Sequence, residues 1–477
     1  MSAVAEKGEG MPRRWAALAA LYLAMFMNIL DVSAVNLALP AIREGLHASA
    51  TELEWVLVIY VLTFAAGLLP FGLFGDVIGR ERVFMWGVAG FSLSSLACGL
   101  AADTGSLVAS RAVQGLAAAM MVPQVLAIVH VIFPEEERGK AFGLFGTISA
   151  LGAVAGPLVG GVIVSADIAG LGWRPIFLVN IPVGMFSLYG AWRFVPKIRA
   201  AERVTADWAG TIVFALAIAG FVFPLVEGRR FGWPLWCFAL MALSAGLGGL
   251  FLKLQARRAA AGLAQLLPAA LLSDPMFLRG LALVCAFFSG LAGVFFVLAI
   301  FLQSGLGLSP LAAGIALAPH PVGVMIGAYL SGRFASRTPD RRVAFGIFIL
   351  FLGMVSVRLA TVGTPLTGAD FLLPLLSVGL GTGVTIAALF QSILSRVSSA
   401  DAGAGSGVLQ AFQQIGIALG IALQGQIFFQ VLGPSPSLAS SPAAYLAAVQ
   451  AALLYPAGVF LALTLIAVIS LKRRAGS

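Results

Sequence analysis

One carboxylate lies deep inside an apolar stretch of this sequence: Asp31, within the run of residues 15–39. The other 19 of the 20 acidic residues fall in loops or close to the ends of apolar stretches. An ionisable side chain in the middle of a membrane-spanning helix is costly, so it is a functional candidate by default. Because a carboxylate can take up and release a proton, Asp31 suggests proton transfer.

Arg111 is the basic residue best placed to pair with Asp31. At a rise of 1.5 Å per residue, Asp31 lies about 6 Å from the middle of its stretch and Arg111 about 12 Å, both toward the same side. An arginine side chain can span the difference, and an ion pair would lower the cost of both charges. We hypothesise that proton uptake on Asp31 is coupled to substrate release. The alternative is a static pair that only holds two helices together.

His320 stands between Pro319 and Pro321, near the middle of the apolar stretch 310–332. Two prolines leave backbone carbonyls without partners, so this helix is predicted to be broken, and broken helices often line transporter sites. Histidine titrates near physiological pH, which makes His320 a second candidate for proton coupling. A neutral histidine bonded to the freed carbonyls is an equal alternative.

Uncharged amides form a polar face on the stretch 404–430. At 100° per residue, four of its glutamines fall within an arc of about 100°. Such a face suits a wet cavity that accepts varied ligands, although hydrogen bonding between helices is the alternative. The amide residues expected to line a substrate cavity are Gln410, Gln413, Gln414 and Gln424, together with Asn28, Asn36, Gln114 and Gln303 from other stretches.

No set of catalytic residues is recognisable. The sequence has no P-loop, no GxSxG and no HExxH motif, and its three cysteines have no metal-ligand spacing. The sequence therefore predicts neither an enzyme nor a cofactor or metal site. Without an ATP-binding motif, an ion gradient must supply the energy for any active transport, and the proton gradient is the expected source.

About fourteen apolar stretches position these residues. Of 477 residues, 60% are hydrophobic and 10% are charged, whereas soluble domains carry roughly 25% charged residues. Stretches of about 20 apolar residues are typical of transmembrane helices, so we expect an all-α membrane protein. The expected spans are 15–39, 52–72, 82–101, 107–132, 141–164, 173–195, 208–226, 234–253, 279–303, 310–332, 343–362, 370–395, 404–430 and 445–471.

The basic residues are distributed unevenly between the two sides of these spans. With the N-terminus inside, 23 of the 29 Lys and Arg residues lie inside and five outside, while Arg111 lies within a span. The positive-inside rule then places both termini in the cytoplasm. This asymmetry explains the net charge of +9 without any nucleic-acid partner.

Two turns of similar composition suggest an internal duplication. The segments 72–83 and 331–343 both combine glycine with several arginines. We therefore expect an N-terminal six-helix bundle (1–195), a linker with two additional spans (196–278) and a C-terminal six-helix bundle (279–477). The segment 256–265 within the linker could form a short helix on the membrane surface.

Small residues recur in the stretch 141–164. Glycines at this spacing let helices approach closely, and a flexible contact of this kind could also act in gating. The residues concerned are Gly152, Gly156, Gly160 and Gly161, with Pro157 among them.

Several motifs, taken in order along the chain, resemble those of the major facilitator superfamily, specifically its fourteen-span drug:proton antiporter branch (the EmrB/QacA type). ILDVSAVNLALPAI (29–42) is similar to the first-span signature, with Asp31, Asn36 and Pro40 in place. RAVQGLAAAMMVP (111–123) and LGAVAGPLVGG (151–161) are similar to the span 4 and span 5 motifs, and WRPIFLVNIPVG (173–184) and FLQSGLGLSPLAAGIALAP (301–319) also resemble this branch. GLFGDVIGRERV resembles the loop motif, which it matches at Gly72, Asp76, Gly79, Arg80 and Arg82 and leaves at Val77 and Glu81.

The resemblance implies two helical halves around a central cavity, with alternating access and export of amphipathic compounds against proton entry. Asp31 and Arg111 match positions implicated in proton coupling, and the loop and span 5 motifs imply a conformational role. Val58 stands where many relatives carry an acidic residue. A neutral, anionic or monocationic substrate is therefore favoured over a dication, and Asp31 would serve proton and substrate alike.

The sequence thus predicts a proton-coupled exporter of small amphipathic drugs or metabolites in the cytoplasmic (inner) membrane. We expect a monomer in the lipid bilayer, with a periplasmic adaptor protein as an optional partner. One alternative is a proton-coupled uptake symporter of the same fold. Another is a membrane sensor that does not transport, or a membrane enzyme.

Overall fold

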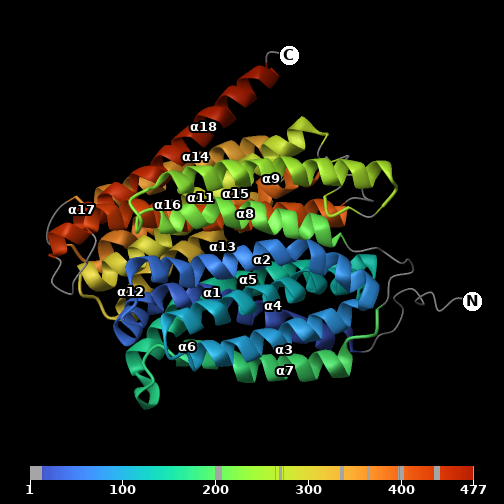
Figure 1. The fold of residues 1–477 in the computed structure, drawn as a ribbon, viewed down its shortest axis with the longest axis horizontal. Helices are drawn as coiled ribbons and strands as arrows, with labels where there is room; N and C mark the ends of the chain where they lie inside the picture. Colours follow the sequence, from blue (N-terminus) through green and yellow to red (C-terminus); the bar gives the residue numbers. More distant parts are fainter. Residues whose placement is uncertain are drawn as a thin grey trace, which may run out of the picture.

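The computed structural model describes residues 13–198, 207–263, 273–333, 338–362, 366–395, 402–433 and 441–475, with 265–267, 271 and 397. These residues form helices and connecting turns, and none of them lies in a β-strand. Most helices run along one common direction (Figure 1). Their bounds are α1 (Arg14–Leu46), α2 (Ala50–Ile78), α3 (Arg80–Gly99), α4 (Thr104–Ile132), α5 (Glu135–Ala166), η1 (Ile168–Gly170), α6 (Pro175–Leu178), α7 (Asn180–Phe194), α8 (Trp208–Glu227), α9 (Leu235–Ala260), α11 (Pro275–Ile300), η2 (Phe301–Gly305), α12 (Pro310–Leu317), α13 (Pro319–Arg333), α14 (Pro339–Ala360), η3 (Gly368–Phe371), α15 (Leu372–Leu394), α16 (Ala402–Leu432), α17 (Pro442–Ala452) and α18 (Leu454–Ala475).

The helices match the expected spans. In the described part of the chain, 13 helical segments are long and apolar enough to cross a membrane. The expected span at 82–101 corresponds to α3, a helix of 20 residues that packs along α4 and α7. Because α3 contains three serines and three charged residues, it is less apolar than the others. The prediction of an all-α membrane protein with about fourteen spans is confirmed.

The helix break predicted at His320 is present. α12 ends at Leu317 and α13 begins at Pro319. Pro321 has no amide hydrogen to donate to the carbonyl of Leu317, four residues earlier, so the helical hydrogen-bond ladder cannot continue there. The tenth span therefore crosses the bundle as two helices.

Two other spans, 173–195 and 445–471, were expected as single stretches and are also interrupted, in each case four residues before a proline. α6 ends at Leu178, four residues before Pro182, and α17 ends at Ala452, four residues before Pro456. In both places proline removes the hydrogen bond that the fourth preceding carbonyl would accept. The prolines were a visible signal of these breaks.

The segment 256–265, considered above as a separate surface helix, does not form one in its described residues. Its first residues continue α9, which runs to Ala260, because alanine and arginine favour helix and no residue there stops it. Gln255 is fully buried, and its Oε1 accepts the backbone N–H of Leu266 (2.9 Å) and of Leu267 (3.2 Å). The chain after α9 therefore turns back onto that helix.

The helix contacts connect neighbours in sequence and distant segments. α1 packs against α5 and α7, α2 against α4, and α15 against α13 and α14. α8 contacts α9 and also both α2 and α16. In Figure 1 the blue to teal helices lie together in the lower part and the orange to red helices mostly in the upper part, with α8 and α9 in green alongside. The division into 1–195, 196–278 and 279–477 stays a prediction.

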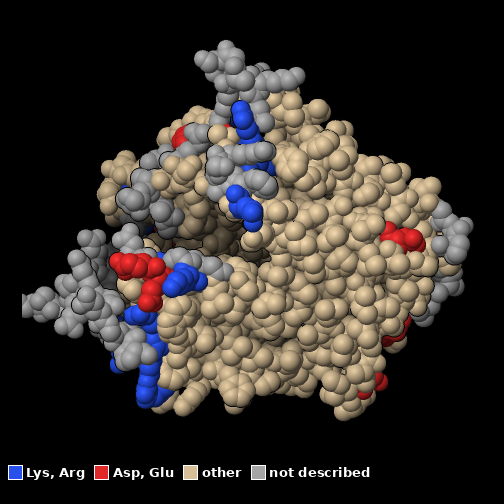
Figure 2. Space-filling model, turned by 180° about the vertical axis from the view of Figure 1, so that it is seen from behind, with Lys and Arg blue, Asp and Glu red and all other residues tan. Residues whose placement is uncertain are grey.

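The two ends of the bundle differ in charge. We call the end at which α1 begins and α2 ends the basic end, because Arg13, Arg14 and Arg80 lie there. The end at which α1 ends and α2 begins is called the opposite end. In Figure 2 charged side chains gather at the left, the basic end, beside a hollow in the surface. The flank seen in the same view carries very few charges, as a surface facing lipid requires.

Candidate substrate and proton site

Asp31 of α1 and Arg111 of α4 form a buried ion pair. Arg111 Nη1 lies 2.6 Å from Asp31 Oδ2, and the two side chains are 1% and 0% exposed. The predicted pairing is confirmed. The geometry follows from two long helices that run side by side in opposite directions, so residues at similar depths face each other.

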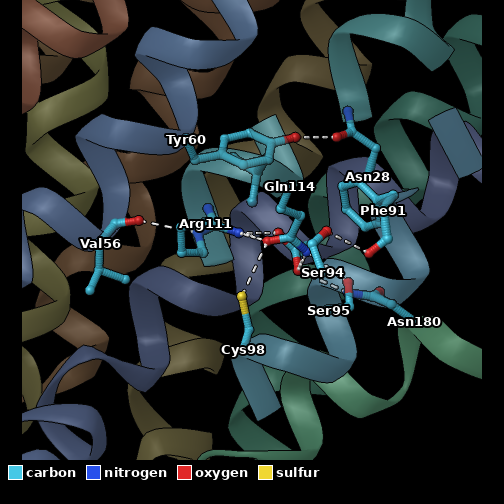
Figure 3. A network of polar contacts seen from close by, with 12 residues as sticks. Asn28, Val56, Tyr60, Phe91, Ser94, Ser95, Cys98, Arg111, Gln114 and Asn180 are labelled. Atoms are coloured by element: carbon cyan, nitrogen blue, oxygen red, sulfur yellow. Dashed lines mark hydrogen bonds and ion pairs between the residues drawn. The ribbon is translucent and has the colours of Figure 1, made fainter. Parts of the chain in front are cut away.

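Two amides complete the surroundings of Asp31. Gln114 Nε2 and Asn180 Nδ2 donate to Asp31 Oδ1 at 3.1 and 2.9 Å. Both amides also donate to Ser95 Oγ, at 2.8 and 3.2 Å (Figure 3). With Arg111, the carboxylate of Asp31 accepts hydrogen bonds from three side chains on two other helices, α4 and α7. Charge-assisted bonds of this kind satisfy an ionised carboxylate away from water.

Asn180 and Ser95 were missed in the sequence. Asn180 is fully buried at the start of α7, directly after the break that Pro182 causes. A polar residue beside a helix break in an apolar stretch was a usable signal. Gln114 was predicted to line the cavity, but it is fully buried and bonded to Asp31 and Ser95 instead.

Arg111 is held on several sides. Its Nε donates to the carbonyl oxygen of Val56 at 3.1 Å, and its Nη1 also donates to Gln114 Oε1 at 2.6 Å. The guanidinium lies over the ring of Tyr60, 4.2 Å from the centroid, as in a cation–π contact. Tyr60 in turn donates through its hydroxyl to Asn28 Oδ1 (Figure 3), so Asn28 supports the site from behind the tyrosine.

A cavity of about 380 Å³ lies beside this network. Its polar lining consists of Ser33, Asn36, Tyr60, Arg111 and His320, and no Asp or Glu lines it in the described part of the chain. The apolar lining residues are Val32, Leu37, Leu57, Val61, Ala153, Pro157, Phe288, Leu291, Ala292, Phe295, Leu317, Pro321, Ile417 and Ile421. Helices from both ends of the sequence therefore enclose one mostly apolar space.

Arg111 connects this cavity to the buried carboxylate. Arg111 lines the cavity and contacts Asp31, which does not line it. The hypothesis that Asp31 itself contacts both proton and substrate therefore needs correction: a ligand in the cavity meets the guanidinium of Arg111 and the ring of Tyr60.

His320 lines the same cavity from the helix break. Its ring packs against that of Phe295 at an interplanar angle of 53°, with 4.4 Å between the centroids. Its Nε2 is buried without a hydrogen-bond partner among the described residues. A buried donor or acceptor without a partner is unusual and favours a ligand or water as the missing partner.

Two predicted cavity glutamines join helices instead. Gln424 Nε2 donates to the backbone carbonyls of Ser289 (3.3 Å) and Gly290 (3.5 Å), which connects α16 to α11. Gln303 Nε2 donates to the carbonyl of Leu37 at 2.9 Å, which connects η2 to α1. In both cases the amide nitrogen is bonded to a neighbouring helix, while Gln424 Oε1 is buried without a hydrogen-bond partner among the described residues. The alternative of hydrogen bonding between helices describes both side chains better than cavity lining.

The remaining predicted amides lie in different surroundings. Asn36 lines the cavity and donates to the carbonyl of Val32 at 3.1 Å. From α16, Ile417 and Ile421 line the cavity. The other glutamines predicted on this helix are partly buried and lie outside the cavity lining: Gln410, Gln413 and Gln414.

The small residues of α5 lie at helix contacts. A Cβ atom at Gly152 would stand 3.1 Å from Ile29 of α1, and Gly156 lies against Ser33. Gly160 lies against Ala34, also on α1, so the helix that carries Asp31 packs on these glycines. On another side, a Cβ atom at Gly161 would stand 2.8 Å from the carbonyl oxygen of Pro310 at the start of α12, and the carbonyl of Pro157 lies against Gly314.

The loop motif forms the tight turn between α2 and α3. Gly79 has a φ of 117°, which a residue with a side chain rarely adopts. Glu81, one of the departures from the motif, is buried, and its Oε2 accepts the backbone N–H of Ile198 at 2.9 Å. The side chain of Asp76 lies outside the described residues. The other motif residues, Gly72, Arg80 and Arg82, flank this turn at the basic end.

The chain is similar to known transporters over most of its length. The family model described as Major Facilitator Superfamily matches residues 21–421. A probable actinorhodin transporter of Streptomyces coelicolor is 39% identical over 88% of this chain and 73% of its own length. The puromycin resistance protein pur8 of Streptomyces alboniger is 35% identical over 86% of this chain and 81% of its own length.

Solved structures show the same fold at low sequence identity. A bacterial homologue of the human lysosomal transporter Spinster, in an inward-facing and unoccupied conformation, has a TM-score of 0.66 at 18% identity and covers 96% of this chain and 97% of its own. A POT family transporter in complex with a thioalcohol-conjugated peptide has a TM-score of 0.69 at 12% identity and covers 96% of each chain. The match to the family model and the curated relatives show that the chain belongs to the major facilitator superfamily, in the branch that contains drug-resistance transporters such as the puromycin resistance protein.

Proposed function

We propose that this protein exports small amphipathic compounds across the cytoplasmic membrane in exchange for protons, by alternating access and with both termini in the cytoplasm. The observation that carries the proposal is the buried Asp31–Arg111 pair at the wall of a mostly apolar cavity. The relatives described as an actinorhodin transporter and a puromycin resistance protein support export of antibiotic-like compounds. The proton gradient is the energy source, since no ATP-binding motif is present.

Proton binding at Asp31 acts on the cavity through Arg111 and α1. The carboxylate of Asp31 accepts hydrogen bonds from side chains of α4 and α7. Protonation of Asp31 therefore weakens the contacts of α1 with both helices. The guanidinium of Arg111 then loses its counter-charge while it still faces the cavity. In addition, α1 carries Ser33 and Asn36 of the cavity wall and packs on the glycines of α5. The protonation state of Asp31 can therefore change both the ligand contacts and the helix packing.

The cavity favours a neutral, anionic or monocationic amphipathic substrate. Most of its wall is apolar, and its polar groups can hydrogen-bond to a ligand but supply no negative charge in the described residues. This agrees with the expectation drawn from Val58 that a dication is not the preferred substrate. Tyr60, Arg111 and His320 would orient the polar groups of the compound.

The experiment compares the wild type with Asp31→Asn in proteoliposomes that carry an imposed pH gradient. We expect substrate-dependent proton movement with the wild type and none with Asp31→Asn, while both proteins fold and bind substrate. Glu136→Gln, which removes an exposed carboxylate at the basic end, is the matched control. Puromycin and actinorhodin are the first compounds to test. Unchanged proton-coupled transport by Asp31→Asn would contradict the proposal, and the direction of counterflow separates export from uptake.

A further inference from the structure

A second fully buried carboxylate lies at the opposite end of the bundle. Glu54 is in the second turn of α2, and its side chain is 0% exposed. α8 and α16 cover it. A Cβ atom at Gly425 of α16 would stand 2.9 Å from the carboxyl group of Glu54, so the backbone of α16 lies directly on that group.

The end of α8 supplies the charged neighbours of Glu54. Arg229 Nη2 lies 3.4 Å from Glu54 Oε1 and 3.3 Å from Thr51 Oγ1, and its guanidinium lies 4.8 Å from the ring centroid of Phe429 of α16. Glu227, the last residue of α8, is also buried, and its Oε1 accepts the indole N–H of Trp55 at 2.7 Å. Three helices thus meet around two buried carboxylates and one partly buried guanidinium.

The hydrogen bonding of this cluster is incomplete. Glu54 Oε2, Glu227 Oε2 and Arg229 Nη1 are buried and have no hydrogen-bond partner among the described residues. Asp31 is equally buried but accepts three side-chain donors at 2.6–3.1 Å. The present packing therefore satisfies an ionised Asp31 and leaves an ionised Glu54 under-solvated, which is costly away from water.

We propose that Glu54 is a second proton-binding carboxylate, which takes up a proton when α16 closes over it and releases it when α16 moves away from α2 at the opposite end. The inference rests on the alternating access and orientation proposed above. In the closed arrangement the proton removes the cost of a buried carboxylate whose Oε2 has no hydrogen-bond partner among the described residues. In the open arrangement water reaches the carboxylate, and its ionised form pairs with Arg229.

The movement involved is one that alternating access requires. At the opposite end, α2 contacts α16 while α5 contacts α12, so these contacts must part before the cavity can open there. α8 contacts both α2 and α16 and contributes Arg229 and Glu227. The additional span α8 would thereby help to set the proton affinity of Glu54 in the closed arrangement.

The neighbours of Glu54 determine the sign of the pH effect. The charged groups facing the cluster come from α8 and the turn after it: Glu227, Arg229 and Arg230, whose Nη1 lies 3.8 Å from Glu227 Oε2. The covering residues Gly425, Phe429 and Phe296 do not titrate. Because the closed arrangement binds the proton more tightly, a lower pH at the opposite end should favour closure.

The test measures the distance between spin labels on the two sides of this closure. Labels at Ile168→Cys and Val431→Cys, both at exposed positions of the opposite end, are placed in a chain in which Cys98, Cys237 and Cys285 are replaced by alanine. Double electron–electron resonance in nanodiscs is recorded from acidic to alkaline pH. We expect the wild type to pass from a short to a long distance as the pH rises, and Glu54→Gln to keep the short distance throughout.

Two further variants test whether the transition depends on the charge environment of Glu54. Arg229→Gln should move the midpoint of the transition to higher pH, by roughly one pH unit or more, because ionised Glu54 loses its cation. Glu44→Gln, an exposed carboxylate at the same end, should behave as the wild type. A wild type whose distance does not depend on pH would overturn the proposal, and so would a Glu54→Gln variant that keeps the wild-type transition.

Asp31→Asn distinguishes a failure of the proposed function from a failure of the inference about Glu54. Asp31→Asn should keep the pH-dependent distance change, since Glu54 remains, while it loses proton-coupled transport. If Asp31→Asn transports normally but Glu54→Gln loses the transition, the role of Asp31 is wrong and that of Glu54 stands. If Asp31→Asn abolishes the distance transition and Glu54→Gln does not, Glu54 is not the group responsible.

Discussion

The backbone of Gly156 in α5 lies directly against the side chain of Ser33 in α1, two residues beyond Asp31. Ser33 also lines the cavity, so this contact joins the proton-binding helix, the ligand wall and the glycine-rich helix at one point. Close packing of this kind leaves no room for a methyl group unless one helix moves.

Gly156→Ala should therefore slow transport by forcing α1 and α5 apart. Overpacking of this kind costs about 1–3 kcal/mol of stability. The measurement is the transport rate in proteoliposomes, alongside thermal unfolding. Gly146→Ala is the matched control, because a Cβ at Gly146 meets no described atom within 4 Å. Equal transport by the two variants would show that this contact has no role in the cycle.

Arg111→Lys should abolish proton-coupled transport although it keeps the positive charge. Lysine has no planar fork with which to bond Asp31, Gln114 and the carbonyl of Val56 together. Substrate-dependent proton release is the measurement. Arg193→Lys, at an exposed position at the end of α7, should have no effect. Retained coupling in Arg111→Lys would mean that charge alone suffices at this position.

Asn180→Ala should destabilise the protein through Asp31. A hydrogen bond to a charged group contributes about 1.5–3 kcal/mol, and this substitution removes one such bond from Asp31. The decrease in thermal stability should be smaller in an Asp31→Asn background, because the charged acceptor is then absent. A double-mutant cycle checks this coupling. Purely additive effects would show that Asn180 acts independently of Asp31.

His320→Gln should weaken substrate binding and leave proton coupling in place. His320 lines the cavity and packs against the ring of Phe295, but it is not part of the hydrogen-bond network around Asp31. We expect KM to rise with little change in the maximal rate or in the pH profile. His130→Gln, at an exposed position on α4, is the control. A changed pH profile with unchanged KM would instead assign His320 to proton coupling.

Several features of the site could be predicted because they depend on position along single helices. Asp31 and Arg111 lie at matching depths in helices of opposite direction, so their pairing followed from the helical rise. The break at His320 followed from Pro321, which removes a backbone donor wherever it occurs in a helix. Pro182 and Pro456 remove a donor in the same way. Other prolines, among them Pro40 and Pro123, stand inside continuous helices, so a proline alone does not decide where a helix breaks.

Other features could not be predicted, because they depend on which helix faces which. Four glutamines of α16 share one face, yet Gln424 is buried against α11, and the residues of α16 that line the cavity are Ile417 and Ile421. Glu54 lies near the start of its helix, a position that suggests contact with water, but α8 and α16 cover it completely.

Sequence information alone was thus sufficient for the membrane class, the spans and the buried charge pair, since hydrophobicity, length and helical rise are local properties. Only the tertiary structure showed that Arg111 stands between Asp31 and the cavity, that Asn180 and Ser95 complete the network, and that Glu54 is enclosed. Each of these depends on contacts between helices far apart in the chain, and the rotation of each helix about its axis decides which side chains meet.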